Sequence, residues 1–252
     1  TNSSAGEIMI PEAGTKKLKL RTSGTTHSRV YSGLRSGLMN GDFLPGQRLI
    51  VRSIAESFNT SAMPVREALR QLVSDGALFD HPNRGVIIPD FSVEAIADLV
   101  RVRCSIEGAA TEWAASTITN AEIDEIQALN EGMKKCAAQG NATNYLVLNR
   151  SFHFSVYRAA RSQTLQPIIE RLWLRAGPWL NIMRDKATLG YGLDHHREII
   201  ERLRKGDGTR AKQALIEDIS DAADIMLNAL RKPQIIASKV AGTRVLRKPH
   251  AV

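Results

Sequence analysis

Long apolar runs, cysteines and an N-terminal leader pattern are scarce or absent in this 252-residue sequence. No apolar run approaches the roughly 20 residues of a transmembrane helix. The polar, Ser- and Gly-rich start has no apolar core followed by a small-residue cleavage site. Cys104 and Cys136 lie far apart, which favours two buried thiols in a reducing compartment over a disulfide or a redox switch. We therefore expect a cytoplasmic protein that does not enter a membrane.

The sequence also lacks internal repeats and a charge excess in its central part. The formal net charge is +8, yet basic and acidic residues cancel over 92–231. The excess lies in residues 1–25, predicted as a flexible basic N-terminal arm, and in 233–252, predicted as a basic C-terminal tail. For the first ten residues, an appended remnant with a frayed terminus is an equal alternative. Charge alone therefore argues weakly for nucleic acid, and the case depends on where individual arginines lie.

The stretch from Pro45 to Pro89 has the pattern of a winged helix-turn-helix. Apolar residues recur at helical spacing in two short segments separated by Asn59-Thr60, and Ser61 is a good N-cap for the second segment. Two apolar runs joined by a polar, partly basic tip then predict a β-hairpin wing. The predicted elements are helices over 26–40, 52–58 and 61–74, with wing strands over 77–79 and 86–88. Residues 26–91 should form this DNA-binding domain.

Arginines on the helix predicted over 61–74 are the best candidates for contacting DNA. Arg66 and Arg70, four residues apart, share a polar face and could bind guanine O6 and N7 or a phosphate. Arg52, at the start of the helix predicted over 52–58, is placed to bind a backbone phosphate. The N-terminus of the helix over 61–74 is placed to do the same. The wing tip could reach the minor groove. The alternative is that these are solvated surface arginines. The predicted DNA-contacting set is Arg52, Ser61, Ala62, Met63, Arg66, Arg70, Asn83, Arg84 and Gly85.

This stretch resembles the DNA-binding domain of GntR-family bacterial repressors. The matching residues are Pro45-Gly46, Leu49, Ile54-Ala55, Pro64-Val65-Arg66-Glu67-Ala68-Leu69, Leu72, Asp75-Gly76 and Arg84-Gly85. The resemblance implies that Arg52, Ser61, Arg66 and Gly85 occupy positions that touch DNA. Many members of the family have Arg where this sequence has Ala62, so base preference here should depend less on that position.

From residue 92 to residue 231 the sequence contains no convincing strand. Amphipathic segments with short polar breaks predict an antiparallel bundle of six or seven helices. The candidate helices cover 92–117, with a break near Cys104, then 120–139, 142–161, 164–185, 190–205 and 208–231. The predicted fold is therefore mainly α. An N-terminal winged helix-turn-helix of three helices and a β-hairpin precedes an all-α domain over 92–232.

Asn149 and His153, four residues apart, lie on one face of a predicted helix. His196 lies on a further helix and Asp218 on the last one, so the four side chains could converge on a divalent ion in the bundle core. Imidazole and carboxylate ligands suit zinc best, with manganese or nickel as alternatives. Taken from the residues alone, histidines that are hydrogen-bonded within a core are an open alternative.

The helical region resembles the FCD ligand-binding domain of the FadR branch of GntR regulators. The matching residues are Asn149-Arg150-Ser151-Phe152-His153, His196-Arg197-Glu198-Ile199, Gly206-Asp207 and Ala214. Many FCD domains have a third histidine where Asp218 stands, and a carboxylate can ligate the same metals. The resemblance also implies that Arg103, paired with Glu107, helps to hold a carboxylate effector near the metal. An ordinary intrahelical ion pair is the alternative.

These features predict a bacterial transcription regulator, expected to be a repressor. It would bind a palindromic operator as a homodimer and respond to a small organic or sugar acid. A metal-free regulator that binds a larger apolar effector, such as an acyl thioester, is one alternative. A metalloenzyme fused to a DNA-binding module is another. The sequence has no HExxH motif and no glutamate beside the candidate ligands to act as a general base, so enzyme activity is not expected.

Overall fold

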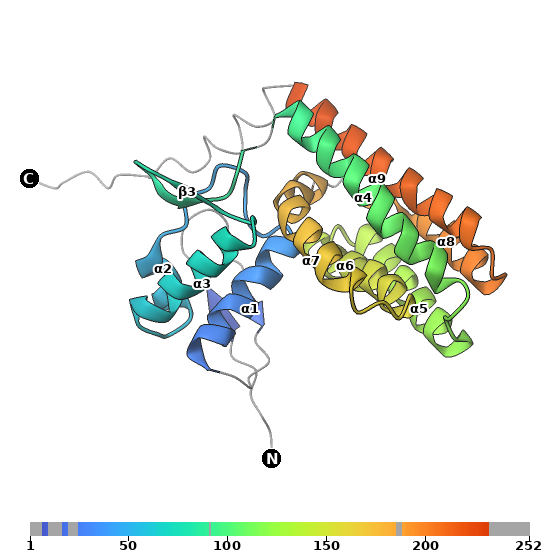
Figure 1. The fold of residues 1–252 in the computed structure, drawn as a ribbon, viewed down its shortest axis with the longest axis horizontal. Helices are drawn as coiled ribbons and strands as arrows, with labels where there is room; N and C mark the ends of the chain where they lie inside the picture. The colour runs from blue at the N-terminus through green and yellow to red at the C-terminus, as the bar shows by residue number, and fades with distance from the viewer. Residues whose placement is uncertain (1–6, 10–16, 20–24, 91, 185–187, 232–252) are drawn as a thin grey trace, which may run out of the picture.

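A computed structural model describes residues 7–9, 17–19, 25–90, 92–184 and 188–231 (Figure 1). Within these residues the fold is mainly helical, as predicted. The DNA-binding part contains α1 (Thr26–Met39), α2 (Val51–Ser57), α3 (Ala62–Ser74), β3 (Phe79–His81) and β4 (Gly85–Ile87). The second part contains α4 (Val93–Ala114), α5 (Asn120–Ala138), α6 (Ala142–Ala159), α7 (Leu165–Ala176), the 3-10 helix η1 (Gly177–Arg184), α8 (Leu193–Arg204) and α9 (Gly208–Arg231).

The three N-terminal helices pack through apolar residues at helical spacing. Val30 and Leu34 of α1 are fully buried against a matching stripe on α3 that includes Val65 and Leu72. Ser61 precedes α3 with an extended backbone, as an N-cap does, but its side chain makes no capping hydrogen bond. The helix-turn-helix therefore depends on burial of these stripes more than on local capping.

The wing is tied to the chain that precedes α2. Gly46 N donates to Ile88 O, and Leu49 N donates to Val86 O at 2.9 Å. The first wing strand begins two residues later than predicted, because Ala77 and Leu78 are buried in the core between α3 and the wing. An apolar pair was thus mistaken for a paired strand, and hairpin pairing begins only at Phe79.

The N-terminal arm contains one feature that the sequence did not predict. Three-residue strands β1 (Glu7–Met9) and β2 (Lys17–Lys19) pair in an antiparallel register, with Glu7 opposite Lys19. Strands this short leave too few residues for a period-two pattern to be visible in sequence. The rest of the predicted arm, and the predicted tail over 233–252, lie outside the described residues.

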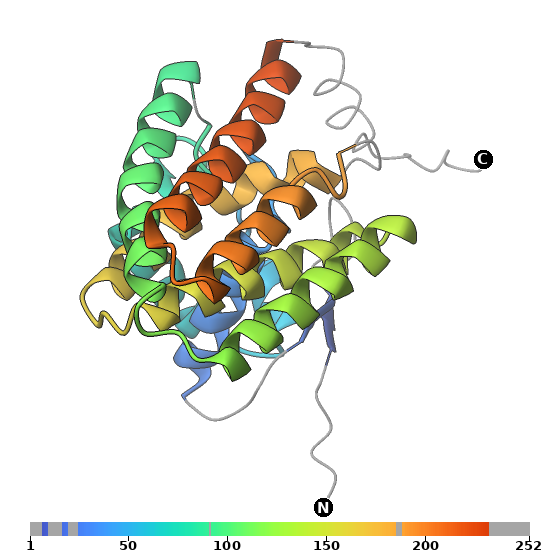
Figure 2. The same ribbon diagram turned by 90° about the vertical axis from the view of Figure 1, so that its right-hand side faces the viewer.

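The second part is an antiparallel bundle in which α9 lies along α4, and α8 packs on both α9 and α5 (Figure 2). Two helix predictions were wrong in detail. Helix α4 continues through Cys104 without a break. The helix predicted over 164–185 ends at Ala176 and continues as η1. Pro178 lacks the N–H that an α-helix would need there, so the chain tightens into a 3-10 helix.

Helix η1 meets the end of α1, and one hydrophobic core runs through both parts of the protein. A Cβ added to Gly177 would lie 2.1 Å from Leu38 O and 2.8 Å from the Leu38 carbonyl carbon, so only glycine allows this approach. None of the helices in the described ranges is long and apolar enough to span a membrane.

Gly177→Ala is expected to lower the free energy of unfolding by about 1–3 kcal/mol, because the methyl group would force two backbones apart. Chemical denaturation would measure the change. Gly108→Ala is the matched control, since its Cβ would meet side-chain atoms and no backbone: Lys212 Cγ at 3.2 Å and Ile216 Cδ1 at an ordinary contact distance of 3.8 Å. That variant should keep or gain stability, because alanine favours a helix interior. Equal stability of both variants would show that α1 and η1 separate at no cost.

Candidate DNA interface and candidate metal centre

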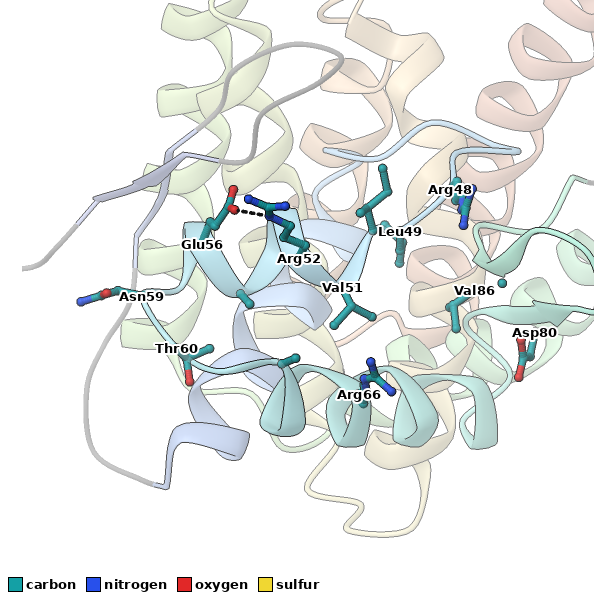
Figure 3. A pocket seen from close by; sticks show the side chains of 14 residues that line it. Arg48, Leu49, Val51, Arg52, Glu56, Asn59, Thr60, Arg66, Asp80 and Val86 are labelled. Carbon is teal, nitrogen blue, oxygen red and sulfur yellow. Dashed lines mark hydrogen bonds and ion pairs between the residues drawn. The ribbon is translucent and has the colours of Figure 1, made fainter.

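An open groove of about 810 Å³ lies between α2, the first turn of α3 and the wing (Figure 3). Arg52 and Arg66 line it, and Arg66 extends from α3 into the groove in Figure 3. Among the described residues Arg66 has no ion-pair partner, so its guanidinium is available to a base or a phosphate. Arg52 Nε contacts Glu56 Oε1 at 2.9 Å, but this pair is solvent-exposed and therefore weak.

Only some of the remaining predicted contacts line this groove. Ala62 and Gly85 belong to its lining. Ser61, Met63 and Arg70 are exposed on α3 and at its N-cap, and Asn83 is exposed at the wing tip, but none of these four lines the groove. Arg84 is exposed too, but its Nη2 donates to Gly46 O at 3.2 Å, which places it on the loop before α2. The structure thus brings Arg52, Ala62, Arg66 and Gly85 of the predicted set to one groove.

Sequence analysis missed Arg48, which also lines the groove (Figure 3). Arg48 forms an isolated antiparallel bridge with Ile87 of the wing, and its side chain is exposed. Its place beside Arg52 and Arg66 depends on pairing between distant segments, so residue spacing gave no signal for it. Glu56 and Asp80 also line the groove, so its charge is mixed.

Three candidate metal ligands converge in the core of the helical bundle. His153 from α6, His196 from α8 and Asp218 from α9 each offer a ligand atom, and these atoms lie within 4.8 Å of one another. His153 Nε2 is 3.4 Å from Asp218 Oδ2, and His196 Nε2 is 3.6 Å from Asp218 Oδ1. Donors bound at about 2.1 Å to a tetrahedral ion lie about 3.4 Å apart, so these spacings fit a shared cation.

His196 provides a second test of that fit. It is fully buried, and neither ring nitrogen has a hydrogen-bond partner among the described residues. Leaving a buried polar atom unsatisfied costs about 1–3 kcal/mol, so such an atom calls for an explanation such as an ion. A divalent cation beside Asp218 would coordinate one ring nitrogen of His196 and so give it the partner that it lacks.

The tautomer of His153 is set by a chain of hydrogen bonds. Tyr157 OH donates to Glu107 Oε2 at 2.6 Å, so its oxygen is left to accept from His153 Nδ1 at 3.3 Å. The proton on Nδ1 leaves the Nε2 lone pair directed toward Asp218. A ligating histidine that donates its other N–H in this way is held in orientation and made more basic. Sequence analysis missed Tyr157, although it lies one helical turn after His153.

Glu107 is the acceptor at the end of this chain. It takes hydrogen bonds from Arg103 Nε and Nη2 at 2.7 and 3.1 Å, and from Trp173 Nε1 at 3.0 Å, in addition to Tyr157. Its side chain is fully buried. Arg103 lines the cavity beside His153 and Asp218, whereas Glu107 does not. The structure therefore places Glu107 behind Arg103, where it orients the guanidinium.

The cavity between these side chains is small, at about 50 Å³. Asn149 also lines it, on the same helix face as His153, as the spacing predicted. Gly192, at the N-cap of α8, is a further residue that sequence analysis missed. A Cβ there would lie 2.6 Å from Asp218 Oδ1, so glycine keeps the carboxylate position free.

His153 and Asp218 have the ionisation states that a metal requires. Burial lowers the pKa of His153 from 6.5 to about 3, so its imidazole is neutral at neutral pH. Burial raises the pKa of the Asp218 carboxyl, but His196, His153 and His195 lower it more, and the net shift is downward. Because the imidazole is neutral and the carboxylate is ionised, neither group has to lose a proton before it binds a cation near pH 7.

Fold and site together define a DNA-binding transcription regulator with a helical second domain, and comparison with known proteins gives the family. The model described as "Bacterial regulatory proteins, gntR family" matches residues 26–88, and the FCD domain model matches residues 98–221. The chain belongs to the GntR family of bacterial regulators and carries an FCD domain. As its relatives are named transcriptional regulators, it is a regulator and not an enzyme.

Two relatives and one solved structure show the extent of the similarity. The regulator McbR of Escherichia coli K12 is 29% identical over 192 residues, 75% of this chain and 87% of McbR. The repressor RspR of the same organism is 23% identical over 211 residues, 83% of this chain and 92% of RspR. The structure of E. coli McbR/YncC aligns with a TM-score of 0.77 at 26% identity, covering 82% of this chain and 100% of the other.

Arg66→Ala should weaken operator binding by about 1–3 kcal/mol and relax the preference at one base pair. Arg48→Ala should weaken binding to all sequences about equally and reduce the salt slope by about 1. Fluorescence anisotropy with a selected operator and a scrambled duplex, over a range of salt, would separate the two effects. Arg210→Ala, at an exposed site on α9, is the control. Equal losses from Arg66→Ala on both duplexes would remove it from base recognition.

Tyr157→Phe is expected to lower zinc affinity about 10–100-fold, because His153 Nδ1 would lose its acceptor while the packing stays nearly the same. Competition with a chromogenic zinc chelator measures this affinity. Tyr31→Phe makes the same chemical change in the DNA-binding part, where Tyr31 OH donates to Asp75, and should leave zinc affinity unchanged. If Tyr157→Phe binds zinc as tightly as wild type, the hydrogen-bond chain does not hold His153.

Proposed function

We propose that this chain is a repressor of the FadR branch of the GntR family, and that its operator affinity is controlled by a small carboxylic acid bound together with a divalent metal. The DNA-binding unit covers 26–91 and the effector-binding unit covers 92–232. The observation that carries the proposal is the convergence of His153, His196 and Asp218 within 4.8 Å in a buried cavity that Arg103 also lines.

His153, His196 and Asp218, with Asn149 beside them, would hold the ion. Two imidazoles with a carboxylate are ligands that zinc binds readily, and manganese or nickel is an alternative. A bound divalent cation supplies a positive centre on which a carboxylate can be placed. Asp218 takes the place of a histidine found in many FCD domains. Since a carboxylate is negative and a neutral imidazole is not, the net charge of the ion with its ligands is one unit less positive here.

Charge explains why the acid would need the metal. Without an ion, Glu107 and Asp218 outweigh Arg103 by one negative charge in and behind the cavity, which disfavours an anion. A divalent cation reverses this balance to one net positive charge. Arg103 has five donor hydrogens, and Glu107 uses only part of them, so donors are left for an effector carboxylate. A larger apolar effector would place apolar atoms against the charged groups of Arg103 and Asp218, which line the cavity, and burying these groups without polar partners is unfavourable.

On DNA, Arg66 would read a base edge while Arg48, Arg52 and the start of α3 hold phosphates. A homodimer would place two such faces in successive major-groove half-sites of a palindromic operator. Repression is supported by the name of RspR as a repressor, and its relief by the acid is part of the proposal. The regulator would act in the cytoplasm, where bacterial operators lie.

Elemental analysis of purified, never-chelated protein, with thermal shifts against acetate, malonate and gluconate, tests this function. About one divalent ion per chain is expected, and acids should stabilise only the metal-loaded form. His153→Ala with His196→Ala should remove both effects because two ligands are lost. His195→Ala is the matched control, since His195 contacts Asp221 at 2.8 Å and does not line the cavity. Stoichiometric metal retained by the double variant would refute the ligand assignment.

A further inference from the structure

Helix η1 touches both the candidate effector cavity and the DNA-binding part. Leu180 and Met183 of η1 line the cavity beside His153 and Asp218. Asn181 and Arg184, each the next residue along the chain, hold the end of α1. Because a 3-10 helix turns every three residues, neighbouring side chains point in different directions, and one short element can face both regions.

Arg184 binds the C-terminus of α1 with most of its guanidinium. Its Nε donates to Gly41 O at 3.0 Å, and its Nη2 donates to Asn40 O at 2.9 Å and to Asp42 Oδ1 at 2.6 Å. Asn181 Nδ2 donates to the same Gly41 oxygen at 2.8 Å. A charged donor that satisfies the last carbonyls of a helix is favourable, and this one is largely buried, with 14% of its side chain exposed.

The two backbones are also in direct contact. A Cβ on Gly41, whose φ is +64°, would lie 2.9 Å from Asn181 N and 3.0 Å from Gly177 O. The reciprocal glycine, Gly177, lies closer still, since a Cβ on it would be 2.1 Å from Leu38 O. No side chain lies between the segments to absorb a shift, so a displacement of η1 must move the end of α1.

The cavity is too small for most acids without such a displacement. Ordinary ligand sites enclose about 300–1,000 Å³, whereas this cavity measures about 50 Å³. Most of the other lining residues belong to α-helices, including α7 with its buried Trp173, and the turn before α8 contributes Tyr191 and Gly192. A 3-10 run longer than three or four residues is uncommon and often marks a hinge, and η1 has eight residues. Among the helices that line the cavity, η1 is thus the one most easily displaced.

We propose that η1 transmits occupancy of the cavity to the DNA-binding part, and that Arg184 is the positioning residue that couples it to α1. The inference depends on the proposed function, because it requires an acid in the cavity. An acid larger than the cavity displaces η1 through Leu180 and Met183. Arg184 and the Gly41–Gly177 contact pass this shift to α1, which carries the recognition helix packed against it.

The test compares wild type with Arg184→Gln, which removes the charge and three of the five donor hydrogens. Zinc-loaded protein is given acetate, malonate or gluconate, and the dissociation constant for a selected operator is measured. In wild type, the acid with the largest thermal shift should change operator affinity by about fivefold or more, the lower end of usual allosteric coupling. In Arg184→Gln, zinc content and the thermal shift should persist, while the change in operator affinity falls below about twofold.

Glu170→Gln is the matched control. Glu170 of α7 forms an ion pair with Arg35 of α1 across the same boundary without involving η1. This variant should keep the operator response, and Arg184→Lys should restore part of it. An undiminished response in Arg184→Gln, or an equal loss in Glu170→Gln, would overturn the inference while leaving the proposed function intact.

Hydrogen exchange of the wild-type protein gives a second measurement that needs no variant to fold. The amides of Gly41 and Asp42 donate to Leu38 O and Gly37 O, and peptides covering them should exchange at a changed rate when zinc and the acid are added. Unchanged exchange, despite acid binding, would overturn the coupling through η1. If zinc or all three acids fail to bind, the proposed function fails and the inference falls with it.

Discussion

The helical part depends on a buried carboxylate that cannot be left unpaired. Glu107 lies inside the bundle and accepts hydrogen bonds from Arg103, Tyr157 and Trp173, which come from α4, α6 and α7. A buried charge is costly unless it is paired and fully hydrogen-bonded, so these contacts fix how the three helices meet. The same contacts orient Arg103 toward the cavity and set the tautomer of His153. Stability and ligand chemistry therefore share one polar network.

The two parts of the protein are joined closely enough for one to influence the other. One hydrophobic core contains residues of both parts, and the end of α1 meets η1 through backbone atoms and through Arg184. A flexible linker between independent domains would separate cavity and DNA face energetically. Here packed elements with little freedom connect them, which is the physical condition for coupling between distant sites.

The errors in sequence interpretation share one cause, the influence of distant contacts. The break predicted near Cys104 is absent because α4 is held along its length by α9. The wing strand begins late because Ala77 and Leu78 are buried under α3. Helix α7 ends before Gly177 and η1 begins there, because α1 approaches at this point and Pro178 has no backbone N–H to donate. Local propensity was a sound guide except where a neighbour from elsewhere in the chain competed with it.

Local spacing alone determined the helix-turn-helix, its exposed arginines and the pairing of Asn149 with His153 on one helix face. These features follow from the periodicity of residues a few positions apart in sequence. Tertiary structure alone decided that His196 and Asp218 meet His153, that Arg48 joins the groove, and that Glu107 lies behind Arg103. It also produced η1 and its contact with α1. Each of these depends on segments far apart in sequence, whose approach is set by packing of the whole core and leaves no periodic trace in any one segment.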